Sequence, residues 1–279
     1  MSRRFVAPGK IILSGEYAVV FGYAGIAVPS SRGMEVVFEE DPALKDIEIR
    51  CEGLRGDELR SYAEKVVAHC RERSHGGRLV IHARLPLGKG LGSSTALVVA
   101  ISRALLSDHA HEGALHIEDI LNPGHSGLDF TTIWEGAPVL FRKRDDPKPF
   151  KLPGWVLQEA ILIDTGLPSE STTELVAWMR SREAEIQEPL KTIGSCTDRI
   201  VQGEPLDLVM RDHHKAQVAL GVVPSDVQEL IAAIEHIGGA AKVIGAGSRG
   251  GGAGMVLALG DKKKNRDMAD RKGVSTMAL

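Results

Sequence analysis

Short apolar runs and longer helical patterns alternate along this chain of 279 residues. Val- and Ile-rich runs bounded by turn residues predict strands, and longer periodic segments predict helices. We predict strands at 34–38, 47–51, 78–84, 158–163, 255–259 and 274–278. We predict helices at 57–73, 96–106, 114–121, 173–182, 183–201, 206–220, 225–237 and 261–271.

Residues 5–20 form two apolar runs interrupted by Pro8-Gly9 and Ser14-Gly15. This punctuation predicts a strand, a turn, and then a second strand or a short helix. Lys10 and Glu16 are charged residues embedded in these runs. A buried charge must be paired or functional, although a lysine at a strand edge can also extend its ammonium group to solvent.

The segment 107–113 is polar and predicts a loop. Its His109 and His111, with His116 beyond, have no partner cysteine, so we do not expect a metal site there. Asp129 follows Ser126-Gly127 at a predicted turn, and 131–141 predicts a strand. An aspartate in that setting commonly stabilises a turn.

Composition excludes several classes of protein. The chain is 43% hydrophobic and 25% charged with a formal net charge of −3, so no overall basic field favours nucleic acid or a membrane surface. Three widely spaced cysteines argue against disulfides and structural zinc. The N-terminus reaches Pro8 before any signal-like apolar core, and we expect a soluble, cytoplasmic protein without a membrane partner.

The densest chemical signal is a glycine-rich stretch at 86–96, PLGKGLGSSTA, which runs into the apolar segment 96–106. Glycines allow backbone N–H groups to converge, and a helix N-terminus adds free N–H groups and partial positive charge. Together they favour phosphate binding. A serine in the first turn, such as Ser94, can bind Mg²⁺ on that phosphate.

Other interpretations of this stretch are weaker. A Walker A loop requires Gly-Lys-Ser/Thr before its helix, and a dinucleotide-binding loop requires glycine at the position of Ser93. A glycine-rich turn before a core helix remains the structural alternative. In the segment 242–254, called the third glycine cluster below, Gly245, Gly247 and Gly250 have the dinucleotide spacing, but a strand rather than a helix follows them.

The pattern P-x-G-x-G-L-G-S-S-x-A resembles the nucleotide loop of the GHMP kinases. The segment APGKIILSGEYAVVFGY at 7–23 is similar to their first motif as mevalonate kinases carry it, with Tyr17 where those enzymes usually have His. Residues 126–129, Ser-Gly-Leu-Asp, match the end of a second motif, and the family's Mg²⁺-binding Glu, eleven positions earlier, falls on Glu118. The cluster at 242–254 resembles the third motif, with Ile244 for the usual Thr and an inserted Ser248-Arg249.

The resemblance implies roles for individual residues. Asp129 and Lys10 would be catalytic: Lys10 would neutralise γ-phosphate charge and keep Asp129 ionised, and Asp129 would orient the attacking hydroxyl and accept its proton late. Mg²⁺ would be held by Ser94 and Glu118, with Asp119 as a substitute. The nucleotide-binding residues would be Pro86, Gly88, Lys89, Gly90, Leu91, Gly92, Ser93, Ser94 and Thr95. The acceptor-binding residues would be Glu16, Tyr17, Ser126, Gly127, Asp129, Thr165, Gly245, Ala246 and Gly247.

The resemblance also implies an α+β fold, with an N-terminal ribosomal-protein-S5-like nucleotide-binding domain at 1–150 and a C-terminal ferredoxin-like domain at 151–279. The expected activity is ATP- and Mg²⁺-dependent phosphorylation of mevalonate, a small hydroxy acid, in isoprenoid precursor synthesis, by an enzyme that could form a homodimer. Phosphomevalonate kinase or another GHMP kinase, a non-catalytic nucleotide-binding protein of the same fold, and a dinucleotide oxidoreductase remain alternatives. Arg249 is the one cation among the glycines of this third cluster, 245–254, and could face phosphate.

Overall fold

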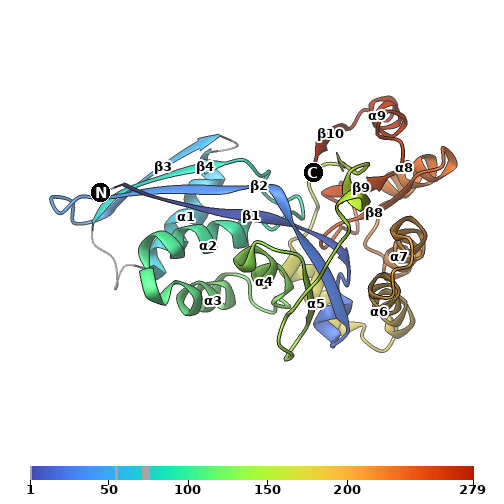
Figure 1. The fold of residues 1–279 in the computed structure, drawn as a ribbon, viewed down its shortest axis with the longest axis horizontal. Helices are drawn as coiled ribbons and strands as arrows, with labels where there is room; N and C mark the ends of the chain where they lie inside the picture. Colours follow the sequence, from blue (N-terminus) through green and yellow to red (C-terminus); the bar gives the residue numbers. More distant parts are fainter. Residues whose placement is uncertain (1, 54–55, 71–75) are drawn as a thin grey trace. The chain divides into compact units, whose positions relative to one another are not determined.

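The computed structural model describes residues 2–53, 56–70 and 76–279 (Figure 1). The chain forms two compact units, the first made of Met1–Lys10, Pro29–Leu87 and Leu91–Ala137. The second unit is made of Ile11–Val28, Gly88–Gly90 and Pro138–Leu279. The sequence predicted a single boundary after residue 150. The division differs because 24–27 pair with a strand at 139–142, which places this early part of the chain in the second unit.

The first unit contains a sheet covered by helices. Strand β2 (Ala24–Glu40) pairs through its second half with β4 (Gly77–Ala83), which is parallel to β3 (Ile47–Gly53), and β1 (Ser2–Ser14) pairs with β2. Helix α1 (Gly56–Cys70) packs on β3 and on α2 (Ser93–Leu105), as Figure 1 shows. Helix α2 in turn contacts α3 (Ala110–Leu121) and α4 (Leu128–Glu135). The fully apolar middle of α2 is buried, as its sequence predicts.

The predicted strand, turn and short helix over residues 5–20 is confirmed, because β1 ends at Ser14 and the 3₁₀ helix Ala18–Phe21 follows. Strand β1 continues through Pro8-Gly9 without a break, and a Cβ on Gly9 would lie 2.8 Å from the Leu91 carbonyl oxygen. Two local predictions in the first unit are wrong. The polar segment 107–113 is a short 3₁₀ helix (Ser107–His109) and the first turn of α3 rather than a loop. Asp129 lies in α4 and not before a strand, since Gly127 begins the helix in the left-handed conformation.

The second unit is built on an antiparallel sheet with the order β10-β7-β9-β8. Its strands are β7 (Ile161–Asp164), β8 (Ala240–Val243), β9 (Met255–Leu259) and β10 (Ser275–Ala278). Its helices are α5 (Thr172–Ser181), α6 (Gln187–Val201), α7 (Leu206–Leu220), α8 (Ser225–His236) and α9 (Lys262–Arg271). The unit also includes β5 (Val139–Arg142), β6 (Lys148–Pro149) and the 3₁₀ helices at Ala18–Phe21 and Gly154–Leu157. Helices α7 and α8 pack on β8, and α9 packs on β7.

The sequence predicted the helices of the second unit closely. The bounds of α7 are those predicted, and α5 begins after Ser171, whose side chain forms a reciprocal capping box with Glu174. The predicted helix 57–73 corresponds to α1, and its last three residues lie outside the described part of the chain. Among the described residues, no helix combines the length and apolar character needed to cross a membrane.

Candidate active site

The glycine-rich stretch leads into the first turn of α2. Gly88, Gly90 and Gly92 have φ values of 66°, 80° and 71°, a region that favours glycine. Gly92 is the N-cap residue of this 13-residue helix, so the free N–H groups of the first turn follow directly after the loop. A helix N-terminus that directly follows a glycine is a suitable cradle for a phosphate group.

Lys10 passes close to this loop within the first unit. Its backbone N–H donates to the Leu91 carbonyl oxygen at 2.9 Å, and a Cβ on Gly92 would lie 3.0 Å from Lys10 Cγ. The Lys10 side chain is 3% exposed, and its Nζ lies 3.1 Å from Oδ2 of Asp129, whose side chain is 37% exposed. The pair therefore combines a buried cation with a carboxylate that reaches solvent from the first turn of α4.

Glu118 lies buried on α3, 2% exposed. Its Oε1 accepts a hydrogen bond from Thr95 Oγ1 at 2.8 Å, while its buried Oε2 has no hydrogen-bond partner among the described residues. Burial raises the pKa of Glu118, the Thr95 hydroxyl lowers it, and the negative charge of Asp129 raises it further. An unpartnered, oriented carboxylate oxygen in this setting is well suited to bind a cation.

The donor set favours magnesium shared with a phosphate. Within the described ranges there is no group of three or more His, Cys, Asp or Glu residues that could hold a metal ion alone. Mg²⁺ commonly uses one or two protein oxygens and completes its shell with phosphate oxygens and water. Glu118 Oε2, together with the half-buried Ser94 in the first turn of α2, fits that chemistry.

Asp119, the alternative metal ligand, has a different environment. Its side chain is 63% exposed, and its Oδ1 lies 2.8 Å from Nε2 of His125. This environment favours Glu118 as the ligand.

Sequence reasoning missed Tyr62 and Asn122. The Tyr62 hydroxyl accepts a hydrogen bond from Asn122 Nδ2 at 3.0 Å. Burial and the charge of Glu118 raise the pKa of Tyr62 to about 12, although hydrogen bonds to Asn122 and Ser94 oppose the rise. The two residues thus border the Ser94 and Glu118 region, and no local pattern in the sequence distinguishes a tyrosine 32 positions before Ser94.

Ser126 and Gly127 shape the start of α4. The Leu128 N–H donates to Ser126 Oγ at 3.2 Å, and Gly127 is the N-cap with φ 96°. Their described contacts orient the helix that carries Asp129.

Glu16 lies inside the second unit rather than at its surface. It is 2% exposed, its Oε1 accepts a hydrogen bond from the fully buried Lys242, and its Oε2 lies 3.0 Å from Nε2 of buried His213. Burial alone would raise the pKa of Glu16, but Lys242 and His213 outweigh it and hold that pKa at about 2. Glu16 was expected to contact the acceptor. Its described contacts instead place it in a buried cluster with Lys242 and His213, where it has a structural role.

Tyr17 fixes the adjacent turn to the third glycine cluster. Its φ is 62°, unusual for a residue with a side chain, and its buried hydroxyl donates to the Ala246 carbonyl oxygen. Burial and the charges of Glu16 and Glu170 raise the Tyr17 pKa, so the phenol stays protonated. Gly247 packs so closely that a Cβ would lie 2.2 Å from the Val222 carbonyl oxygen.

The glycine loop and the third glycine cluster meet within the second unit. A Cβ on Gly90 would lie 2.4 Å from the Ile244 carbonyl oxygen, and one on Gly245 would lie 2.9 Å from Gly90 Cα. Lys89 Nζ lies 2.6 Å from Asp164 Oδ1 at the end of β7. Two of the predicted groups of site residues, 88–90 and 245–247, are therefore in direct contact.

Thr165 and Arg249 are engaged with neighbouring residues. The Thr165 hydroxyl donates to the Gly254 carbonyl oxygen at 2.9 Å and accepts from the Ala253 N–H at 3.0 Å. Arg249 Nε donates to Glu170 Oε1 at 2.8 Å, and its guanidinium lies 5.0 Å from the Trp178 ring centre. Glu170 thus neutralises the charge of Arg249.

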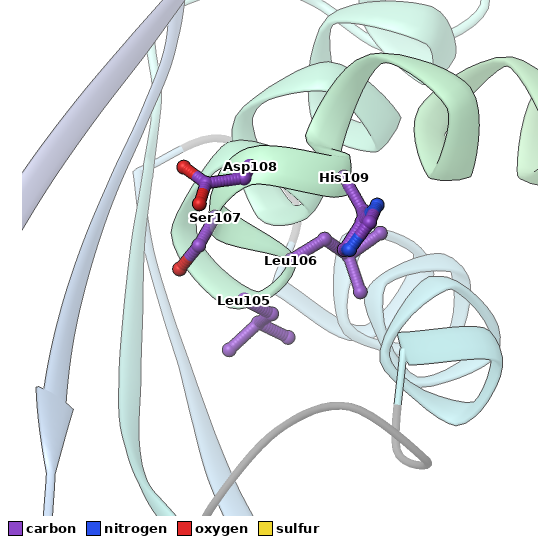
Figure 2. A pocket seen from close by; sticks show the side chains of 5 residues that line it. All are labelled: Leu105, Leu106, Ser107, Asp108 and His109. Atoms are coloured by element: carbon purple, nitrogen blue, oxygen red, sulfur yellow. The ribbon is translucent and has the colours of Figure 1, made fainter.

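A pocket at the C-terminal end of α2 is separate from this site. Figure 2 shows its lining side chains, Leu105, Leu106, Ser107, Asp108 and His109. It lies about 20 Å along the helix from the glycine loop, the length of a 13-residue helix. Its mixed lining includes His109, but the part of the chain that the structure describes offers no further two ligands for a metal there.

Comparisons with known proteins agree with this geometry. Residues 61–126 match the model of the GHMP kinases N terminal domain. The mevalonate kinase of Thermococcus gammatolerans is 29% identical over 93% of this chain and 89% of its own length. The mevalonate kinase of Archaeoglobus fulgidus is also 29% identical, over 92% of this chain and 93% of its own length. The crystal structure of the Methanococcus jannaschii mevalonate kinase superposes with a TM-score of 0.78 at 19% identity, covering 99% of this chain and 96% of that one.

Proposed function

We propose that this chain, a GHMP kinase by its matched N-terminal domain and its fold, transfers the γ-phosphoryl group of ATP to the 5-hydroxyl of mevalonate. The observation that carries the proposal is the Lys10–Asp129 pair beside the glycine loop, with Nζ 3.1 Å from Oδ2. A buried cation and a partly exposed carboxylate next to a phosphate cradle are the groups that transfer to an alcohol requires.

Phosphoryl transfer depends mainly on position and charge neutralisation. The loop N–H groups and the α2 N-terminus bind the β- and γ-phosphates, and Lys10 Nζ neutralises charge that develops on the transferred group. Asp129 Oδ2 orients the attacking hydroxyl and takes its proton late, because a carboxylate is far too weak a base to ionise an alcohol first.

Glu118 and Ser94 would hold Mg²⁺ on the nucleotide. Thr95 fixes the Glu118 carboxylate through the 2.8 Å hydrogen bond and leaves Oε2 free to bind. When bound there, Mg²⁺ would neutralise phosphate charge and orient the phosphate chain. Tyr62 and Asn122 support the same region.

The acceptor segments favour mevalonate over its phosphorylated product. Residues 125–131 and 164–165 contain no Lys or Arg. The phosphate of 5-phosphomevalonate would add close to two negative charges, and Arg249 of the third glycine cluster already pairs with Glu170. The relatives at 29% identity carry the name mevalonate kinase as well.

The test compares acceptors at one fixed MgATP concentration. We expect kcat/KM for mevalonate to exceed that for 5-phosphomevalonate by at least tenfold, the ratio that about 1.4 kcal/mol of differential transition-state binding gives. A ratio that favours 5-phosphomevalonate would replace the substrate with the phosphorylated acid. Nucleotide binding without turnover of either acid would support a non-catalytic member of the fold.

A further inference from the structure

We propose that Lys89, the one cation of the glycine loop, acts as a positioning residue through Asp164 and is not a phosphate ligand. This inference rests on the proposed function, because it concerns how the loop receives a nucleotide. It departs from the sequence-based expectation that Lys89 contacts the nucleotide directly.

The ion pair is short and sheltered. Lys89 Nζ lies 2.6 Å from Asp164 Oδ1, and the two side chains are 13% and 27% exposed. Asp164 Oδ1 also accepts the Gly166 N–H at 3.0 Å, so the carboxylate itself is held at the end of β7. The positive charge of Lys89 is therefore already neutralised by the Asp164 carboxylate, which is itself held in place.

The backbone around Lys89 is fixed to the same sheet. The Met255 N–H donates to the Lys89 carbonyl oxygen at 3.1 Å, and a Cβ on Gly254 would lie 2.8 Å from that oxygen. Gly90 in turn packs directly on Ile244 and Gly245. The Lys89 side chain and backbone therefore both tie residues 88–90 to strands β7 and β9 and to the third glycine cluster.

This arrangement opposes transfer of Lys89 to a phosphate. If Nζ moved to the nucleotide, the sheltered Asp164 carboxylate would lose its cation while still largely enclosed, which is unfavourable. The ion pair instead restrains the loop glycines before a ligand arrives. Flexible residues with positive φ lose conformational entropy when they are ordered on binding, and this restraint reduces that loss. An ion pair that orders the loop in advance increases nucleotide affinity without touching the nucleotide.

Direct and indirect roles predict opposite effects for the Asp164 variant. We would measure MgADP binding by calorimetry for the full chain and for Lys89→Met, Asp164→Asn and the double variant. Positioning predicts that each single variant binds MgADP about 5- to 20-fold more weakly and that the double variant is no weaker than either single one. Lys89→Arg should retain most of the affinity, and kcat at saturating ATP should change by less than about threefold while KM for ATP rises.

A direct phosphate contact predicts that Asp164→Asn binds MgADP as well as or better than wild type, because the freed lysine is available, and that result would overturn the proposal. Unchanged affinity in Lys89→Met would overturn it too. Lys272→Met, which removes an exposed lysine 3.3 Å from Glu229, is the matched control and should bind normally. Wild type that binds MgADP but does not phosphorylate mevalonate would refute the proposed function alone, and wild type that binds no MgADP would refute both.

Discussion

Among single residues, Asp129 has the most direct role in the proposed reaction, because its carboxylate lies 3.1 Å from Lys10 Nζ and remains 37% exposed. Its position in the first turn of α4 gives it a fixed direction. Glu118 differs from it in burial and in its unpartnered oxygen. The two carboxylates therefore suit two tasks, one toward the alcohol and one toward a metal ion.

Asp129→Asn should reduce kcat by about 10²- to 10⁴-fold, since the amide keeps the shape of the side chain but cannot accept the proton. MgADP affinity should stay within about twofold of wild type. Steady-state kinetics and calorimetry measure the two effects. Asp145→Asn, at an exposed carboxylate in the second unit, is the control. Turnover close to wild type would exclude Asp129 from the reaction.

Glu118→Gln should raise the Mg²⁺ concentration for half-maximal rate about tenfold or more, because it removes an anionic ligand oxygen. Thr95→Val should raise it by a smaller factor, because the carboxylate loses the hydroxyl that orients it. Titration of Mg²⁺ in kinetic assays and in ADP-binding assays gives both values. If Asp119→Asn has the larger effect, Asp119 is the metal ligand instead.

At the scale of elements, α7 contributes a buried ionisable face to the second unit. His213 and His214 are 0% and 8% exposed, and His213 contacts the Glu16 carboxylate. Burial, together with the charges of His213 and Lys242, lowers the pKa of His214 to about 4. The folded state therefore favours the neutral form of His214.

This shift predicts a pH-dependent stability with a definite sign. Between pH 6.5 and about 4 the unfolded chain binds a proton at His214 that the folded chain does not, so the free energy of unfolding falls as the pH falls. The loss attributable to this residue is on the order of 3 kcal/mol across the window. His214→Gln should therefore show a flatter dependence of Tm on pH than wild type. Calorimetric melts at half-unit pH steps test it. His236→Gln, at an exposed histidine that ends α8, should retain the wild-type slope.

At the scale of the whole molecule, ligand binding should be visible as stability. A nucleotide that binds only the folded chain raises the free energy of unfolding by about 2.7 kcal/mol at 100 times its Kd. We expect MgADP at that concentration to raise Tm by roughly 5 °C. NAD⁺ at equal concentration should leave Tm unchanged, because the third glycine cluster is followed by β9 and not by a helix. A shift with NAD⁺ alone would favour a dinucleotide enzyme.

The sequence predicted the helices and strands better than it predicted the burial and the partners of individual charged side chains. The α7 bounds and the buried α2 follow from periodicity that is read locally. Helix α4 was missed because Thr131, Thr132 and Ile133 favour strands by propensity, while packing buries Leu128 and Thr132 on one helical face, four residues apart. No local signal could pair Lys89 with Asp164, which are 75 positions apart, or show that Glu16 is enclosed by Lys242.

The contact between Gly90 and the cluster at 244–245 has a consequence for biosynthesis. A ribosome adds roughly 5–20 residues per second, so the glycine loop is complete well before the residues that support it exist. A nascent chain that ends before β8 has the whole motif at 86–96 but not the Ile244 and Gly245 backbone on which Gly90 packs. Prematurely terminated chains of that length should therefore fail to retain nucleotide. Incomplete chains would then not sequester ATP in the cell.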